Sequence, residues 1–311
     1  MTEVTYNRRL HWFAISTVLV MVVTLSAGAL VTSKKAGMAF RDWPTSDGVS
    51  MISYPWLQDF ASNWDKFLEH GHRLAGLLIG SWIIALNVVV HLYESRGWVK
   101  GLAGALLGAV IVQGFLGGFR VWLDDHGLAM VHGFFAACVA SLLITLVTCL
   151  SRGWIEAPKV ASTVSVNHLK PWCIASLGLV MTQYLLGGAI RHHGTMLHEH
   201  LGMGLLTFVV TIANAFVARR TGAAWVSRAA GLLLSVVTLQ VLLGLGTWVL
   251  RWGFAPTGFV AIADSIGQVI VRSSHMLVGV MVFCCTVVYA LRVFRHASIV
   301  AERQRRELVN V

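Results

Sequence analysis

Four histidines of this chain share one sequence setting that suits metal coordination. Each lies near the start of an apolar segment of helix length, and a small residue follows it four positions later. The histidines are His72, His132, His200 and His275, and the small residues are Gly76, Ala136, Gly204 and Gly279. Neutral imidazole is a good axial ligand for haem iron, and the small residue on the same helix face leaves room for a flat ring. The pattern predicts two bis-histidine haem sites. The alternative is four separate histidines that hydrogen-bond between helices.

One carboxylate distinguishes the first of these histidines from its counterpart. Glu69 stands three residues before His72 on the same helix face, whereas the matching position in the second half of the chain is Leu197. A carboxylate beside a haem ligand can relay protons or hydrogen-bond a reacting group. The simpler alternative is an ion pair with Arg73 or Lys66. The asymmetry indicates a working site in the first half of the chain and a permanent cofactor in the second.

Two arginines stand close behind Leu-Gly-Gly motifs. They are Arg120 and Arg191, and both are expected near the same end of the apolar segments as the histidines. Haem propionates are anionic and favour arginine forks, so both side chains are predicted to bind the cofactor. The alternative is that they reach out to the membrane interface as snorkelling side chains.

The segments that carry these residues are long and apolar enough to cross a membrane. Mean hydropathy is +0.71, and 12% of the residues are charged, about half the fraction of a typical soluble domain. Apolar runs of about 17–25 residues span a bilayer as helix. Eight are predicted, at 12–31, 67–90, 102–121, 128–150, 172–190, 196–217, 231–250 and 269–293. The first lacks a small-residue cleavage site, so it is expected to be a membrane helix rather than a signal peptide.

The net charge of +10 is better explained by topology than by nucleic-acid binding. An even number of spans puts both termini on one side, and most of the 24 basic residues fall on that side. The positive-inside rule makes this side cytoplasmic, which places the four histidines near the outer face. The five cysteines all lie within or at the ends of apolar segments, so no disulfide and no zinc site are predicted.

The remaining histidines are weaker candidates for ligands. At the cytoplasmic ends, where solvation is expected, are His11, His91, His168 and His296, and near short outer loops are His126, His192 and His193. His70 and His198 each lie two residues before a ligand candidate, about 200° around the helix, and are expected to face elsewhere. The first outer loop contains the aromatic residues of Phe40–Gly48 and Trp56, so it is either an ordered lid or an interfacial anchor.

The two halves of the chain resemble each other. The motif Gln-x-x-Leu-Gly-Gly at Gln113–Gly118 recurs at Gln183–Gly188, and a looser copy begins at Gln240. Internal repeats of this kind indicate duplicated bundles. The sequence therefore predicts an all-α integral membrane protein of eight transmembrane helices. They are expected as two pseudo-symmetric four-helix bundles, residues 1–158 and 159–311, with both termini cytoplasmic. The second and fourth helices then face each other, as do the sixth and eighth.

Taken together, these residues resemble the haem A synthases, the membrane enzymes that prepare haem A for cytochrome oxidases. The resemblance covers nearly the whole chain. It rests on Glu69-His-Gly-His-Arg73, on Asp42-Trp-Pro44 in the first outer loop, on the repeated glutamine motif and on the other three histidines. Some members carry a cysteine pair in the first outer loop, and this sequence has none there. The resemblance therefore does not extend to a thiol-assisted step.

The resemblance implies a function for each histidine pair. A resident haem b would be held by His200 and His275. The substrate haem O would be bound by His72 and His132, with Glu69 needed for turnover. The reaction would be oxidation of the C8 methyl group of haem O, through an alcohol, to the formyl group of haem A.

The same resemblance implies a setting for the reaction. It places the chain in a bacterial plasma membrane; the distribution of basic residues places the haem sites toward the outer face. It also implies a farnesyltransferase that makes haem O as a partner, and it allows a homo-oligomer; nucleic acid is not expected. An iron with both axial positions filled cannot bind oxygen. Either one ligand of the first pair leaves, or the haem is oxidised by electron removal with water supplying the oxygen atom. The sequence slightly favours the second route.

Two other functions are compatible with the histidines. A dihaem b-type cytochrome coupled to quinol would keep all four ligands and give Glu69 no special duty. A haem transporter built from repeats would need a polar site at mid-depth. This chain concentrates its polar intramembrane residues near one face instead, which disfavours the transporter.

Overall fold

The computed structural model describes residues 5–157 and 163–309, and its long helices match the eight predicted spans. Each is long and apolar enough to cross a membrane. In chain order they are α1 (Arg8–Ser33), α3 (Trp64–Tyr93), α4 (Gly97–Leu123), α5 (His126–Leu150), α8 (Lys170–His193), α9 (Leu197–Arg220), α10 (Ala224–Trp252) and α11 (Ile266–Val309). The predicted all-helical membrane protein is confirmed, and most helices extend a few residues beyond the predicted apolar core.

Short helices connect the long ones. They are α2 (Asp59–Ser62), α6 (Arg152–Ile155) and the 3-10 turns Trp56–Gln58, Asn167–Leu169 and Ala255–Thr257. The side chains of Asn7, Asn63 and Asp125 cap the N-termini of α1, α3 and α5, because each accepts a hydrogen bond from a backbone N–H of the first turn. Such caps satisfy donors that have no partner inside the helix and fix where each span begins.

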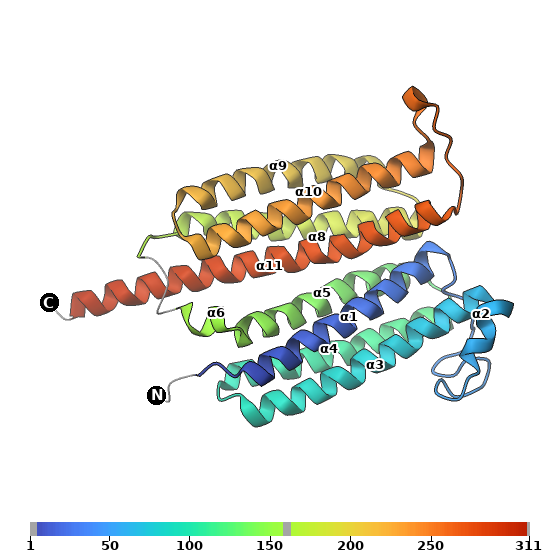
Figure 1. Ribbon diagram of the computed structural model, residues 1–311, viewed down its shortest axis with the longest axis horizontal. Helices are drawn as coiled ribbons and strands as arrows, with labels where there is room; N and C mark the ends of the chain where they lie inside the picture. Colours follow the sequence, from blue (N-terminus) through green and yellow to red (C-terminus); the bar gives the residue numbers. More distant parts are fainter. Residues whose placement is uncertain (1–4, 158–162, 310–311) are drawn as a thin grey trace.

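The long helices pack as two rings of four. In the first ring α1 contacts α3, α3 contacts α4, α4 contacts α5, and α5 returns to α1. In the second ring α8, α9, α10 and α11 contact one another in the same order. The rings meet where α1 and α5 pack against α8 and α11, as Figure 1 shows. The predicted boundary between the halves, at residue 158, lies outside the described residues.

The start of α1 and the end of α11 lie at one end of the molecule (Figure 1). The first long loop and α2 lie at the opposite end. This arrangement follows from an even number of antiparallel spans. Which end of the molecule faces the cytoplasm stays a prediction.

The last helix corrects one prediction about a histidine. We expected α11 to end near residue 293 with His296 in solvent, but the helix continues to Val309 and His296 is only 1% exposed. Its Nε2 lies 3.1 Å from the backbone oxygen of Val164. The extension survives beyond the apolar span because one of its faces, which includes Ile299 and Val300, is buried.

Candidate functional site

The structure brings the four candidate histidines together in the two predicted pairs. His72 of α3 faces His132 of α5, with 6.5 Å between the ring centroids and 88° between the ring planes. His200 of α9 faces His275 of α11, with 6.3 Å between the centroids and 78° between the planes. Each pair lies inside one ring of helices. The two pairs therefore have nearly the same geometry in the two halves of the chain.

The spacing within each pair fits a metal held between two imidazoles. Two metal–nitrogen bonds of about 2.0 Å, added to the radii of two imidazole rings, span about 6 Å. The Nδ1 atoms of His72, His200 and His275 are buried without a hydrogen-bond partner. Among the described residues no group of three or more His, Cys, Asp or Glu side chains could hold a metal ion. Two protein ligands suit a cofactor that brings its own equatorial ligands, as haem does.

A glycine of the preceding long helix supports each of the four rings. A Cβ atom placed on Gly28, Gly117, Gly187 or Gly244 would lie only 2.9, 3.1, 3.2 or 3.2 Å from the Cε1 atom of the facing histidine. Any larger residue there would push the ring away. The first glycine of the Leu-Gly-Gly motif is thus explained by close contact with a histidine ring on the next helix.

Glutamine side chains fill space that we had predicted to be left for a flat cofactor. A Cβ on Gly204 would lie 3.1 Å from Nε2 of Gln183, and one on Gly279 would lie 3.3 Å from Nε2 of Gln240. The small residues at these two positions therefore admit a glutamine from the neighbouring helix. At Gly76 the expectation stands, because no heavy atom lies within 4 Å of such a Cβ.

Glu69 is buried and uses both carboxylate oxygens. Its side chain is 5% exposed, and Nη2 of Arg73 donates to Oε1 at 2.7 Å. Oε2 accepts from the backbone N–H groups of Ala39 and Phe40, at 2.7 and 3.2 Å. The ion pair with Arg73 is thus present, whereas Lys66 pairs with Asp47 instead. Glu69 therefore ties the first outer loop to α3, one helical turn before His72.

The first outer loop is ordered by this attachment. Nη1 of Arg73 donates to the carbonyl oxygens of Asp42 and Thr45, at 2.9 and 2.7 Å. Phe40 is fully buried. His70 faces this loop rather than the paired histidines, as expected, with Nδ1 3.0 Å from Oγ of Ser46. The loop is therefore ordered, as the lid alternative requires, and its role as an interfacial anchor stays a prediction.

A short turn inside the loop is stabilised by a carboxylate. Burial of Asp42 works against its ionisation, yet hydrogen bonds from the Thr45 side chain and from the N–H groups of Gly48 and Asp47 hold its pKa below the usual range. A lowered pKa means that the charged form stabilises the fold, and this stabilisation is lost as the pH falls through that lowered value. The turn therefore keeps its charge throughout the neutral range.

Trp43 of this loop packs against the second glycine of the first Leu-Gly-Gly motif. A Cβ on Gly118 would lie 2.5 Å from ring atoms of Trp43, and Nε1 of Trp122 donates to the Trp43 carbonyl oxygen at 2.9 Å. In the repeat, Gly188 admits Met130 instead. The two glycines of the motif thus serve different contacts: the first supports a histidine, and the second admits a large side chain from elsewhere.

Gly118→Ala is therefore expected to displace Trp43 and loosen the loop. Hydrogen–deuterium exchange of residues 39–48 should increase by about tenfold, since a local destabilisation of about 1–3 kcal/mol is typical of overpacking. Gly114→Ala is the matched control, because a Cβ there meets no heavy atom within 4 Å. Unchanged exchange in Gly118→Ala would show that the Trp43 contact does not hold the loop.

The two predicted cofactor arginines both donate to backbone oxygens. Nη2 of Arg120 lies 2.6 Å from the Gly37 oxygen. Nη2 of Arg191 donates to the Ala29 oxygen and to Oγ of Ser33, each at 3.0 Å. Arg191 thus reaches from α8 in one ring to α1 in the other, and its Nε is buried without a hydrogen-bond partner. Each guanidinium group has further N–H donors, so propionate binding by these two arginines stays a prediction.

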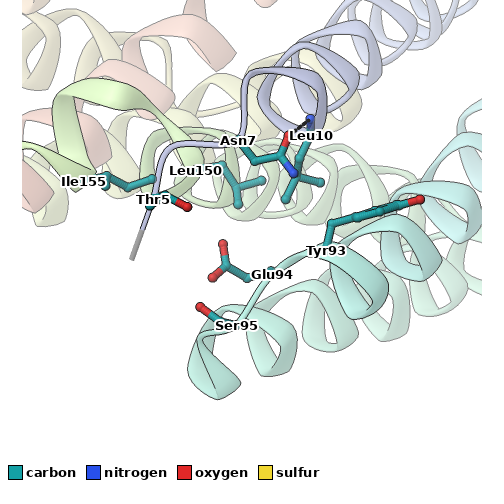
Figure 2. Close-up of a pocket in the computed structure, with 8 residues that line it drawn as sticks. All are labelled: Thr5, Asn7, Leu10, Tyr93, Glu94, Ser95, Leu150 and Ile155. Carbon is teal, nitrogen blue, oxygen red and sulfur yellow. Dashed lines mark hydrogen bonds between the residues drawn. The ribbon is translucent and has the colours of Figure 1, made fainter. Parts of the chain in front are cut away.

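One cavity lies at the end of the molecule opposite the first loop. It has a volume of about 300 Å³ and lies between the start of α1, the end of α3 and the end of α5 (Figure 2). Its acidic residue, Glu94, is already paired with Arg96 at 2.8 Å, and none of the predicted site residues lines it. Its position at the end opposite the first loop gives it no part in the histidine sites.

In the described part of the chain, eight apolar helices of membrane-spanning length define the class of a multi-pass membrane protein, and two facing histidine pairs lie among these helices. The chain belongs to the COX15-CtaA family of cytochrome oxidase assembly proteins, whose family model matches residues 1–139 and again residues 62–199. Together these matches cover more than half of the chain. Haem involvement is thereby supported by the family as well as by the histidine geometry.

Curated relatives carry a more specific name. A "Heme A synthase" of Geobacillus kaustophilus is 26% identical over 195 residues, which is 60% of this chain and 57% of that protein. A "Heme A synthase" of Methylobacterium nodulans is 32% identical over 119 residues, 35% of this chain and 32% of that protein. One of Bacillus cereus is 26% identical over 163 residues, 50% and 47% of the two chains. The matches thus span between a third and somewhat over half of these relatives.

Proposed function

We propose that this chain is a haem A synthase, which oxidises the C8 methyl group of haem O to a formyl group and so supplies haem A for cytochrome oxidase. The observation that carries the proposal is the pair of facing histidines in each half, with an ordered loop tied by Glu69 and Arg73 over the first pair only. Family membership and the names of the relatives support it.

The two histidine pairs take different tasks in this proposal. His200 and His275 hold a resident haem b, and His72 and His132 hold the substrate haem O. Haem iron supplies the redox chemistry, which protein side chains cannot provide. The chain itself binds the macrocycles, orients the methyl carbon and excludes competing reactions at the covered end of the first bundle.

The remaining polar residues assist binding. Arg120 and Arg191 place guanidinium groups beside α1 and the loop, where their N–H groups can donate hydrogen bonds to the propionate oxygens of the cofactors. Glu69 acts on turnover by keeping the loop closed over His72 and His132. The setting that follows is a bacterial plasma membrane with the sites toward its outer face, a farnesyltransferase as the source of haem O, and room for a homo-oligomer.

One experiment tests the activity directly. The chain is produced in membranes together with a haem O-forming enzyme, and the non-covalently bound haems are extracted and identified by mass. Haem A or its hydroxylated precursor is the expected product. Unchanged haem O in folded protein that contains two haems would contradict the proposal and would support a dihaem cytochrome instead.

A further inference from the structure

The four histidine rings rest on the same backbone feature of four different helices. Each ring contacts a glycine, Gly28, Gly117, Gly187 or Gly244, on the preceding long helix. Four residues before that glycine, on the same helix face, the chain carries Thr24, Gln113, Gln183 or Gln240. The backbone therefore supports all four rings alike. Differences between them must come from side chains.

In three of the four cases a glutamine stands at that position. Nε2 of Gln113 lies 3.2 and 3.3 Å from the two ring nitrogens of His132 and 3.0 Å from its backbone oxygen. Nε2 of Gln183 lies 3.3 Å from Nε2 of His200 and 3.0 Å from its backbone oxygen. An amide within hydrogen-bond reach of a ring restrains its rotation and fixes the nitrogen that faces away.

The third glutamine, Gln240, contacts the ring of its histidine but not the histidine's backbone oxygen. Nε2 of Gln240 lies 3.4 Å from Nε2 of His275, and its Oε1, like that of the other two glutamines, is buried without a partner. These unpartnered oxygens can accept a hydrogen bond from one ring N–H once the other ring nitrogen of the histidine is bound to a metal. The glutamines are therefore suited to hold a histidine in its metal-binding orientation.

His72 differs from the other three histidines. The position four residues before Gly28 is Thr24, which has no amide group to reach the ring. Its hydroxyl donates instead to the Val20 and Ala75 oxygens, at 3.1 and 3.0 Å. The space at Gly76 is also open, whereas the corresponding spaces at Gly204 and Gly279 are filled by glutamine amides. His72 thus lacks the amide contact that restrains the other three rings, and no glutamine fills the space at Gly76.

We propose that Gln113, Gln183 and Gln240 are positioning residues for three haem ligands, and that His72 is the exchangeable ligand of the first pair. This inference rests on the proposed function, since it assigns a haem to each pair. It selects the first of the two routes considered from the sequence, in which one ligand of the first pair gives up its position. The resident haem, with both ligands restrained, stays closed.

Cyanide, which binds ferric haem in place of a displaced ligand, is a suitable probe. It is added to the full-length, detergent-solubilised protein that contains both haems, and the Soret spectrum is followed over time. Cyanide should bind at one haem per chain in the unmodified protein, and His72→Ala should speed that binding. Gln183→Leu should open the second haem, with a rate at least about tenfold above that of the unmodified protein. Thr182→Val is the matched control on the same helix turn.

A converse substitution tests the role of Thr24. Thr24→Gln should restrain His72 and slow cyanide binding by about tenfold, with both haems retained. Gln113→Thr is the second variant, in case the longer side chain does not fit on α1, and it should make His132 exchangeable as well. The proposal is overturned if Gln183→Leu stays as closed as the unmodified protein, or if Gln113→Thr leaves cyanide binding unchanged.

The result of the cyanide experiment does not depend on whether haem A is formed. Cyanide binding reports ligand exchange even when no haem A is made, so a normal cyanide pattern without product would contradict the proposed function alone. Haem A formation with equal cyanide access to both haems would contradict only the proposal that the glutamines position their histidines, and would leave the proposed function intact.

Discussion

His275→Ala is expected to abolish binding of the resident haem and with it the low-spin b-type absorption of the second site. The imidazole of His275 faces that of His200 at 6.3 Å and is contributed by α11, which also packs against α1, α5, α8 and α10. Alanine leaves one protein ligand and a gap beside Gly244. The haem-to-protein ratio, measured by pyridine haemochrome after purification, should fall from about two to about one, because each bis-histidine site holds one haem.

The control for this variant is His198→Ala. His198 lies on α9 two residues before His200 and is exposed, so its removal should leave both spectrum and stoichiometry unchanged. A full complement of haem with an unaltered b-type spectrum in His275→Ala would refute the ligand assignment. Loss of haem in both variants would instead indicate general damage to the outer end of the second bundle.

Much of the fold could be predicted from the sequence because a bilayer imposes strong constraints. A span must be helical and apolar over its full length, so hydropathy alone located all eight long helices. The internal repeat then paired the histidines. In two bundles of antiparallel spans, His72 and His132 start from the same side, as do His200 and His275, and the structure places each pair within 6.5 Å.

Contacts between distant segments could not be predicted in this way. Burial of His296 depends on the connection around Val164, which hydropathy does not place. The glutamines recur visibly in sequence, but their contact with histidines of the next helix depends on helix rotation. A signal was present: Gln and Gly are spaced four apart, on one helix face, in α4, α8 and α10 alike. The small residues that contact the histidine rings are therefore those opposite them, at Gly117, Gly187 and Gly244.

Glu69→Gln is expected to suppress haem A formation by at least about tenfold, while the resident haem b remains bound. The two oxygens of Glu69 accept hydrogen bonds from different partners, one from Arg73 and the other from the N–H groups of Ala39 and Phe40. Glutamine replaces one acceptor with a donor, which must face either a guanidinium or two amides. Breaking a buried pair of this kind costs about 3–5 kcal/mol. Product is measured by mass after haem extraction. Glu199→Gln, at an exposed glutamate of α9, is the control.

The variant at Arg73 separates two ways in which Glu69 could act. If Glu69 works by holding the loop closed, Arg73→Gln should lower product formation to a similar extent and raise hydrogen–deuterium exchange in residues 39–48, because the same clamp is lost. If Glu69 works as a proton-transferring group, Arg73→Gln should leave much of the activity intact. The hydrogen bonds favour the first outcome, since both carboxylate oxygens are already engaged. Full activity in Glu69→Gln would contradict both, and it would remove the asymmetry on which the assignment of the first pair as the working site depends.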